Sequence, residues 1–258
     1  MRVAFTTWCT DDFFEATGCQ KLINSARYFH PDIPFFRVNK VPEQIRGQHP
    51  HAFLGSMMAI SCLDFIDDYD LVVHFDADST ITGSLNELLA ADYEVAVVRN
   101  NNDFDGPGRG RYFTIQDIPA DDFLNAGLVA STSKQFWIDW DNFNREKVGD
   151  YSGWENDTLN LLVHSKKYKT RILDSKDQSV FYGLASVSGE YAATGKYYTW
   201  ASWKNAYVKD DKLFLDSPIA TKQIKVIHQA GGQSVYPKQQ YEKFFSDEVV
   251  AYLKKITA

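Results

Sequence analysis

The sequence is poor in cysteine and has no long apolar run. Its three cysteines, Cys9, Cys19 and Cys62, are too few and too scattered for a disulfide framework or a zinc site. Such sparse use of cysteine fits a reducing compartment. No stretch approaches the roughly 18 apolar residues of a membrane span, and Met1 to Thr7 lacks the long apolar segment of a signal peptide. We therefore expect no membrane span and a cytoplasmic location.

Positive charge is also scarce. The chain has 27 Lys and Arg against 34 Asp and Glu, which gives a formal net charge of -7. Without a basic stripe to neutralise phosphates, nucleic acid is not expected as a partner. Hydrophobic residues at 44% and charged residues at 24% are ordinary for a globular protein. A length of 258 residues permits one large α/β domain, and we expect a single domain over residues 1–258.

Strand-like and helix-like segments alternate along the chain. Short apolar runs predict strands, and apolar residues at helical spacing predict helices. The expected strands are residues 3–7, 34–38, a run from 71 that ends in two aspartates, 94–98, 123–131, 171–173 and 223–228. The expected helices are a segment capped by Asp11 and Asp12 and ended by His30-Pro31, then residues 52–66, 85–89, 134–143, 154–164 and 237–256. This order predicts an α/β fold with a mostly parallel central sheet flanked by helices.

Two aspartates end the apolar strand that begins at Leu71. Because a strand alternates faces, Asp76 and Asp78 are expected to project to the same side. Two neighbouring carboxylates repel each other unless a positive charge lies between them, and Mg²⁺ or Mn²⁺ prefers carboxylate oxygen. The alternative is a solvated strand end followed by a turn. Ligands of parallel sheets bind beyond the carboxyl ends of the strands, which favours the metal-site interpretation.

A long segment rich in glycine and asparagine interrupts the alternating pattern over residues 99–122. Long loops in compact domains tend to be functional or disordered. Arg109 and Arg111 are candidates to reach a phosphate or an acceptor from it, and we expect the part over 100–121 to close over a bound ligand. Incidental arginines in a solvated loop are an equal alternative.

Four segments in order resemble the GT-A glycosyltransferases, most closely glycosyltransferase family 8. Tyr69–Leu89 is similar to that family's strand, Asp-x-Asp metal motif and following helix, and Phe123–Ser131 is similar to its Phe-Asn-Ala-Gly strand. Glu155–Asn160 stands where the family commonly has Asp-Gln-Asp-x-Leu-Asn, and Val226–Gly232 resembles its C-terminal strand with a metal-binding histidine. Lys238 is displaced from the place of the family's phosphate-binding lysine.

The resemblance implies transfer of a hexose from a nucleotide diphosphate sugar, with a UDP-sugar as the first expectation, to a hydroxyl of a carbohydrate or glycoconjugate acceptor. Asp78 and His228 would hold Mn²⁺, with Mg²⁺ as an alternative, and Asp76 would ligate the metal or bind the donor ribose. The nucleotide-binding part would span about residues 1–98 and the acceptor side about residues 99–258. The expected donor contacts are Thr6, Thr7, Asp76, Ala77, Asn125, Gly127 and Gly231.

The expected catalytic residues are Glu155, Asn156 and Asp157 at the start of a helix. An inverting enzyme would use a carboxylate as general base towards the acceptor hydroxyl. The resemblance implies retention instead, with Asn156 in the place of the family's glutamine beside the anomeric carbon. A helix whose acidic first turn is favoured by the helix dipole is the structural alternative.

Other interpretations remain open on the sequence alone. Asp76-Ala77-Asp78-Ser79-Thr80 also matches the motif of haloacid dehalogenase-like phosphatases, in which Asp76 would be the nucleophile. A non-catalytic sugar-binding module is a third possibility. Aromatic residues between positions 181 and 207 are expected either to form an acceptor platform or to fill the core; they include Tyr191, Tyr197, Tyr198, Trp200, Trp203 and Tyr207.

Overall fold

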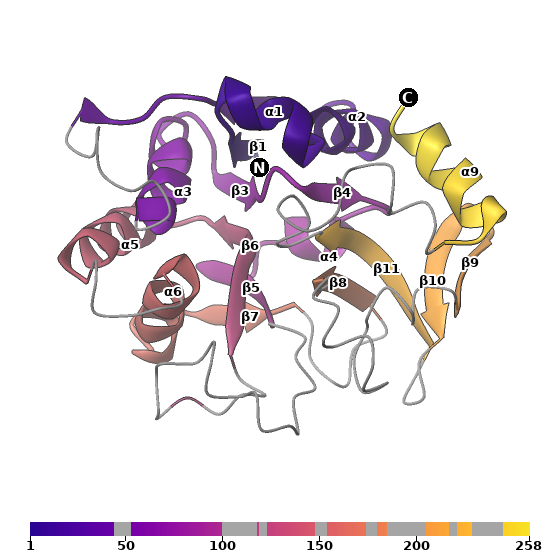
Figure 1. Ribbon diagram of the computed structural model, residues 1–258. Helices are drawn as coiled ribbons and strands as arrows, with labels where there is room; N and C mark the ends of the chain where they lie inside the picture. Colours follow the sequence, from indigo (N-terminus) through magenta and orange to yellow (C-terminus); the bar gives the residue numbers. More distant parts are fainter. Residues whose placement is uncertain are drawn as a thin grey trace, which may run out of the picture.

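The computed structural model describes residues 1–43, 53–99, 118, 123–147, 154–173, 180–184, 205–216, 221–228 and 245–258. These residues form two β-sheets with helices packed around them (Figure 1). No helix of this described part combines the length and the apolarity needed to cross a membrane.

A six-stranded sheet forms the centre of the molecule, in the order β2-β1-β3-β6-β5-β7. Its strands are β1 (Val3–Trp8), β2 (Phe35–Val38), β3 (Leu71–Phe75), β5 (Val95–Arg99), β6 (Leu124–Ser131) and β7 (Thr170–Ile172). Strand β1 pairs in parallel with β2 and β3, and β5 pairs in parallel with β7. Only β6 runs antiparallel to its neighbours β3 and β5 in this sheet. The mostly parallel sheet expected from the sequence is therefore confirmed.

The second sheet has the strand order β4-β11-β10-β9, and β8 pairs in parallel with β11. Its strands are β4 (Ser79–Ile81), β8 (Val180–Leu184), β9 (Ala206–Lys209), β10 (Lys212–Asp216) and β11 (Thr221–His228). A tight turn links β9 to β10, with positive φ at Asp210 (50°) and Asp211 (55°), a conformation that aspartate tolerates. Of these strands, β11 was predicted from the sequence, whereas β4, β8, β9 and β10 were not.

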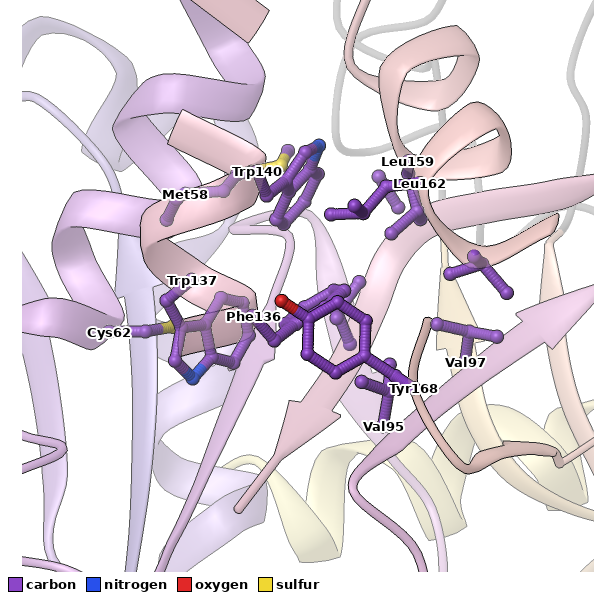
Figure 2. Close-up of a cluster of buried hydrophobic side chains, with 14 of the residues drawn as sticks. Met58, Cys62, Val95, Val97, Phe136, Trp137, Trp140, Leu159, Leu162 and Tyr168 are labelled. Carbon is purple, nitrogen blue, oxygen red and sulfur yellow. The ribbon is translucent and has the colours of Figure 1, made fainter. Parts of the chain in front are cut away.

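Helices cover both faces of the central sheet. One face packs against α3 (Leu54–Leu63), α5 (Lys134–Glu146) and α6 (Trp154–His164) through a cluster that includes the fully buried Trp137 and Trp140 (Figure 2). The other face packs against α2 (Cys19–Phe29), α4 (Asn86–Leu89) and strand β4. Because side chains alternate along a strand, Val72 of β3 packs in the cluster on the first face and Val73 packs in the cluster on the second face.

The prediction of one N-terminal helix is wrong in one respect, because the structure has two helices in this segment. Helix α1 (Asp11–Thr17) ends and α2 begins at Gly18, whose φ of 74° and ψ of 25° lie in the left-handed region. Glycine adopts that conformation without the steric cost that other residues carry. The break follows directly from this residue.

The predicted C-terminal helix over 237–256 is confirmed from residue 247 on, and it is wrong at residues 245–246, which are not helical. Helix α9 runs from Asp247 to Ile256, and the Ser246 side chain accepts a hydrogen bond from the Val249 backbone N–H at its start. A serine cap of this kind fixes where a helix begins. Phe245 and Ser246 precede the helix, and residues 229–244 lie outside the described part.

Candidate active site

The two aspartates lie in a tight turn that joins the two sheets. Strand β3 ends at Phe75, β4 begins at Ser79, and the Ser79 backbone N–H donates to the Asp76 carbonyl over 3.0 Å. The Asp76 N–H donates to the Gly127 carbonyl over 2.9 Å. The expectation that strand alternation places Asp76 and Asp78 on one side is thus wrong about the cause. The turn, not an extended strand, presents both carboxylates together.

His228 completes a three-residue cluster with these aspartates. It ends β11, where it is paired with Ser79 of β4, so the antiparallel pairing brings it beside the turn. Its Nε2 lies 3.0 Å from Asp76 Oδ2 and 3.1 Å from Asp78 Oδ1. One ligand atom from each residue lies within 4.8 Å of the others. The structure therefore brings together the three metal ligands named from the sequence.

The carboxylates of this cluster stabilise the charged form of His228, and His228 stabilises the charged form of Asp76. Burial alone would lower the pKa of the His228 imidazole, but the Asp78 and Asp76 carboxylates outweigh burial and raise that pKa to about 10. Burial alone would raise the pKa of the Asp76 carboxyl, but its contacts with His228 and His74 hold the pKa well below its usual range. Without a metal, a protonated His228 therefore supplies the positive charge between the two carboxylates.

Gly127 provides the space for the His228 ring. A Cβ at position 127 would lie 2.2 Å from both Cε1 and Nδ1 of His228, a distance that real side chains do not reach. The Gly127 N–H donates to Asn125 Oδ1 over 2.8 Å, so the Asn125 side chain is turned back onto its own strand. Both residues were expected at the donor; the structure places Gly127 against His228.

The first turn of α6 is bound to strand β6 by asparagine side chains. Asn156 Oδ1 accepts from the Ala126 backbone N–H over 2.8 Å, and one turn later Asn160 Oδ1 accepts from the Leu124 N–H over 2.8 Å. The pairing of β6 with β5 is irregular between Val97 and Val98, next to these groups. The asparagines thus supply hydrogen bonds to β6 where the regular ladder is interrupted.

Glu155 and Asp157 flank Asn156 but have different surroundings. Burial raises the pKa of the Glu155 carboxyl to about 8, and the negative charge of Asp76 adds to this effect while His228 opposes it. Asp157 is fully buried.

The remaining expected donor contacts lie near the ends of β1 and in the turn. Thr6 and Thr7 are fully buried; Thr6 Oγ1 lies 3.3 Å from Cys62 Sγ, whereas Thr7 Oγ1 has no hydrogen-bond partner among the described residues. Ala77 packs in a small cluster with Cys9 and Cys19.

Several residues named from the sequence lie outside the described part of the chain. They are Gly231, Lys238, Arg109 and Arg111 with most of the 100–121 segment, and five of the six candidate platform aromatics. The sixth, Tyr207, lies on β9 and stacks on Phe214 of β10 with ring centroids 5.7 Å apart. That contact belongs to the packing of the second sheet.

His74 is a component of the site that the sequence analysis missed. It is buried in β3, with Nδ1 3.3 Å from Ser61 Oγ of α3 and Nε2 3.8 Å from Asp76 Oδ1. The two oxygens of Asp76 thus face different histidines, Oδ1 towards His74 and Oδ2 towards His228. The available signal was a histidine within an otherwise apolar strand, because a buried polar group needs a partner.

Comparisons with known proteins show which fold this arrangement belongs to. No known family profile matches the sequence, and no curated protein matches it. A solved glycosyltransferase involved in glycosylation of the major capsid of PBCV-1 is similar in structure, with a TM-score of 0.55 and 10% identity, over 95% of this chain and 98% of that one. The galactosyltransferase LgtC, solved with donor and acceptor sugar analogs, gives a TM-score of 0.53 and 14% identity over 99% and 96%.

The bifunctional glycosyltransferase WbbM also resembles this chain in structure. Its TM-score is 0.54 at 16% identity, and the match covers 98% of this chain and 49% of WbbM. At such low identity these likenesses establish the fold. The mixed α/β architecture, its mostly parallel central sheet and these neighbours agree, and the chain has the GT-A fold of glycosyltransferases.

Proposed function

We propose that this protein is a metal-dependent glycosyltransferase that moves a hexose from a UDP-sugar to an acceptor hydroxyl with retention at the anomeric carbon. One observation carries the proposal. Asp76, Asp78 and His228 converge within 4.8 Å at the junction of the two sheets, in a chain with the GT-A fold. The sugar donor and acceptor analogs named for LgtC support this class of substrate.

The residues present fit a divalent cation. Two carboxylates and one imidazole offer oxygen and nitrogen ligands, a mixed set that Mn²⁺ tolerates and that Mg²⁺ accepts less readily. Asp78 and His228 would hold the ion, and Asp76 would ligate it or bind the donor ribose. When bound, the ion supplies positive charge to the diphosphate that leaves as the anomeric bond breaks.

The chain's own residues would orient the donor around this point. The nucleotide would lie against the part formed by about residues 1–98, where the hydroxyl of Thr7 is buried without a described partner. Thr6, Ala77, Asn125, Gly127 and Gly231 complete the proposed donor contacts. The acceptor would approach from the part formed by about residues 99–258.

The catalytic groups would come from the first turn of α6, namely Glu155, Asn156 and Asp157. This turn is tied to β6 through Asn156, so its side chains are held in place relative to the sheet that carries Asp76. Fixed positions of this kind lower the entropy that a reaction must overcome.

A panel of nucleotide sugars tests the proposal. Purified protein is incubated with each donor and Mn²⁺, and the released nucleotide is identified, with UDP-glucose and UDP-galactose tested first. We expect UDP release that a chelator abolishes. Release of phosphate from simple esters without nucleotide-sugar turnover would favour the phosphatase. In that class the motif normally opens the core fold, whereas here β1 and β2 precede the aspartates. Sugar binding without release would indicate a non-catalytic module.

A further inference from the structure

The Asn156 amide is hydrogen-bonded to protein groups at both its oxygen and its nitrogen. Its oxygen accepts a hydrogen bond from the Ala126 backbone N–H over 2.8 Å. Its nitrogen donates to Glu155 Oε1 over 3.0 Å. An amide held at both ends cannot turn to a sugar without breaking a bond to β6 or to Glu155. Asn156 is therefore poorly suited to meet the anomeric carbon.

Glu155 differs from Asn156, because only one of its two carboxylate oxygens has a hydrogen-bond partner among the described residues. Oε1 accepts from Asn156, whereas Oε2 is buried and has no hydrogen-bond partner among the described residues. A buried carboxylate oxygen without a partner costs free energy, so such an atom in a fold needs an explanation. The neighbouring Asn156 binds the Ala126 N–H, and the next residue, Gly127, contacts both His228 and Asp76, so the first turn of α6 lies next to these residues.

A network of buried hydrogen bonds reaches the backbone carbonyl of Glu155. Thr158 Oγ1 donates to the Glu155 carbonyl over 3.2 Å and accepts from Trp140 Nε1 over 3.2 Å. Asn144 Nδ2 of α5 lies 3.4 Å from the same Thr158 oxygen, and Asn144 Oδ1 accepts from the Ser56 backbone N–H over 3.1 Å. Three helices therefore fix the turn that carries Glu155, as preorganised reacting groups require.

We propose that the Glu155 carboxylate is the catalytic residue that meets the anomeric carbon of the donor, and that Asn156 is a positioning residue which aims it. This inference rests on the proposed function. In a UDP-sugar the anomeric carbon is joined to the terminal phosphate through one oxygen, so it lies next to whatever holds the diphosphate. Glu155 lies outside the ligand cluster, and its Oε2 is buried without a hydrogen-bond partner among the described residues.

The reaction then proceeds in two displacements. The deprotonated Glu155 carboxylate forms a bond through Oε2 to the anomeric carbon while the bond from that carbon to the diphosphate oxygen breaks, and the electron pair leaves with the diphosphate. The acceptor hydroxyl oxygen then bonds to the anomeric carbon, the bond to Glu155 breaks and restores the carboxylate, and the hydroxyl proton passes to the departing diphosphate. Two inversions give net retention.

The first test uses Glu155→Gln, which keeps an oxygen for the Asn156 amide to bind but removes the carboxylate. We expect transfer to fall by about 1,000-fold or more while the Kd for UDP with Mn²⁺, measured by calorimetry, stays within about threefold of the wild type. The matched variant Asn156→Ala should lower kcat by about 10- to 100-fold with little change in KM, because it acts through orientation.

Chemical rescue supplies the second test and does not depend on the Gln variant. In Glu155→Ala, added azide should restore nucleotide release and yield a glycosyl azide of inverted configuration, identified by mass spectrometry and NMR. A Glu155→Gln protein that keeps more than about a tenth of the wild-type rate, or a rescue experiment without the azide product, would overturn the inference. If the wild type itself transfers no sugar, the proposed function fails and the inference fails with it.

Discussion

Gly127 and His228 lie in direct contact across the junction of the two sheets. A Cβ at position 127 would be 2.2 Å from two atoms of the imidazole, and the Gly127 carbonyl accepts the Asp76 N–H over 2.9 Å. One backbone position of β6 thus touches a ligand from β11 and the turn after β3. The geometry of the metal-ligand cluster depends on the absence of a side chain at this point.

Gly127→Ala should therefore displace His228 and weaken metal binding. We expect the Mn²⁺ affinity to fall by at least about tenfold and the free energy of unfolding to fall by about 1–3 kcal/mol, the usual cost of overpacking. Calorimetric titration and thermal unfolding measure the two effects. Gly83→Ala is the control, because its Cβ would meet Lys225 Cδ at 3.1 Å and none of Asp76, Asp78 and His228. Equal Mn²⁺ affinity for Gly127→Ala and wild type would contradict the prediction.

Metal binding should release a proton from His228. The pKa of this imidazole is raised to about 10 in the metal-free protein, so it is charged at pH 7.5, but it must be neutral to bind a metal. Metal affinity should therefore rise as pH rises from 6.5 to 8. Calorimetry in buffers of different ionisation enthalpy should count about one proton per Mn²⁺.

The proton count is best made in the Glu155→Gln background. The pKa of the Glu155 carboxyl is raised to about 8, so this group also titrates near the working pH and would add to the count. Adding His228→Gln to that background should reduce the proton release to near zero. A binding enthalpy that does not vary with the buffer would show that His228 is not the group that loses a proton.

His74→Leu should loosen the orientation of Asp76. The variant removes the nitrogen that lies 3.8 Å from Asp76 Oδ1, and loss of a group that orients a metal ligand typically weakens metal binding about 10- to 100-fold. His74→Gln should bind Mn²⁺ more tightly than the Leu variant, because its amide can take the place of Nε2. If the Leu variant bound Mn²⁺ as tightly as the wild type, the prediction would be wrong and His74 would contribute only to packing.

His30 should make the fold sensitive to acid. Burial first and the charge of Lys225 second lower the pKa of this imidazole, whose Nε2 accepts from the Leu85 N–H over 3.1 Å. Since the folded-state pKa lies below the unfolded value of about 6.5, the unfolded chain binds more protons in this window and stability falls as pH drops below it. His30→Gln, which keeps an acceptor, should lose less Tm than the wild type between pH 7.5 and 5.5. Parallel losses would contradict this.

The sequence was sufficient to predict that Asp76, Asp78 and His228 lie together, and to predict most of the central sheet. The two aspartates come at the end of an apolar strand, and the resemblance to family 8 pointed to His228 at the end of another. The prediction of Trp154–His164 as a helix matches α6 at both ends. The reason given for the pairing of the aspartates was nevertheless wrong, because a two-residue spacing cannot distinguish a strand from a tight turn.

Other features depend on contacts between residues far apart in the chain. The fit of Gly127 against His228 and the approach of His74 to Ser61 arise only when strands and helices pack together. Asn156 is, in the sequence, a free amide at a helix start; only the fold shows that the Ala126 N–H occupies it. The β9–β10 hairpin was missed because two aspartates in left-handed conformation form its turn, a weaker signal than glycine.

The central claim is metal-dependent turnover of a nucleotide diphosphate sugar at Asp76, Asp78 and His228. Chromatography of the nucleotides released from UDP-hexoses by wild type and by Asp78→Asn tests it most directly. The account predicts UDP from at least one donor with Mn²⁺, none after chelation and a loss of about 100-fold or more in the variant, since a ligand carboxylate is missing. UDP release that survives both the chelator and the substitution would contradict the claim, as would wild-type protein that neither releases UDP nor binds it with Mn²⁺.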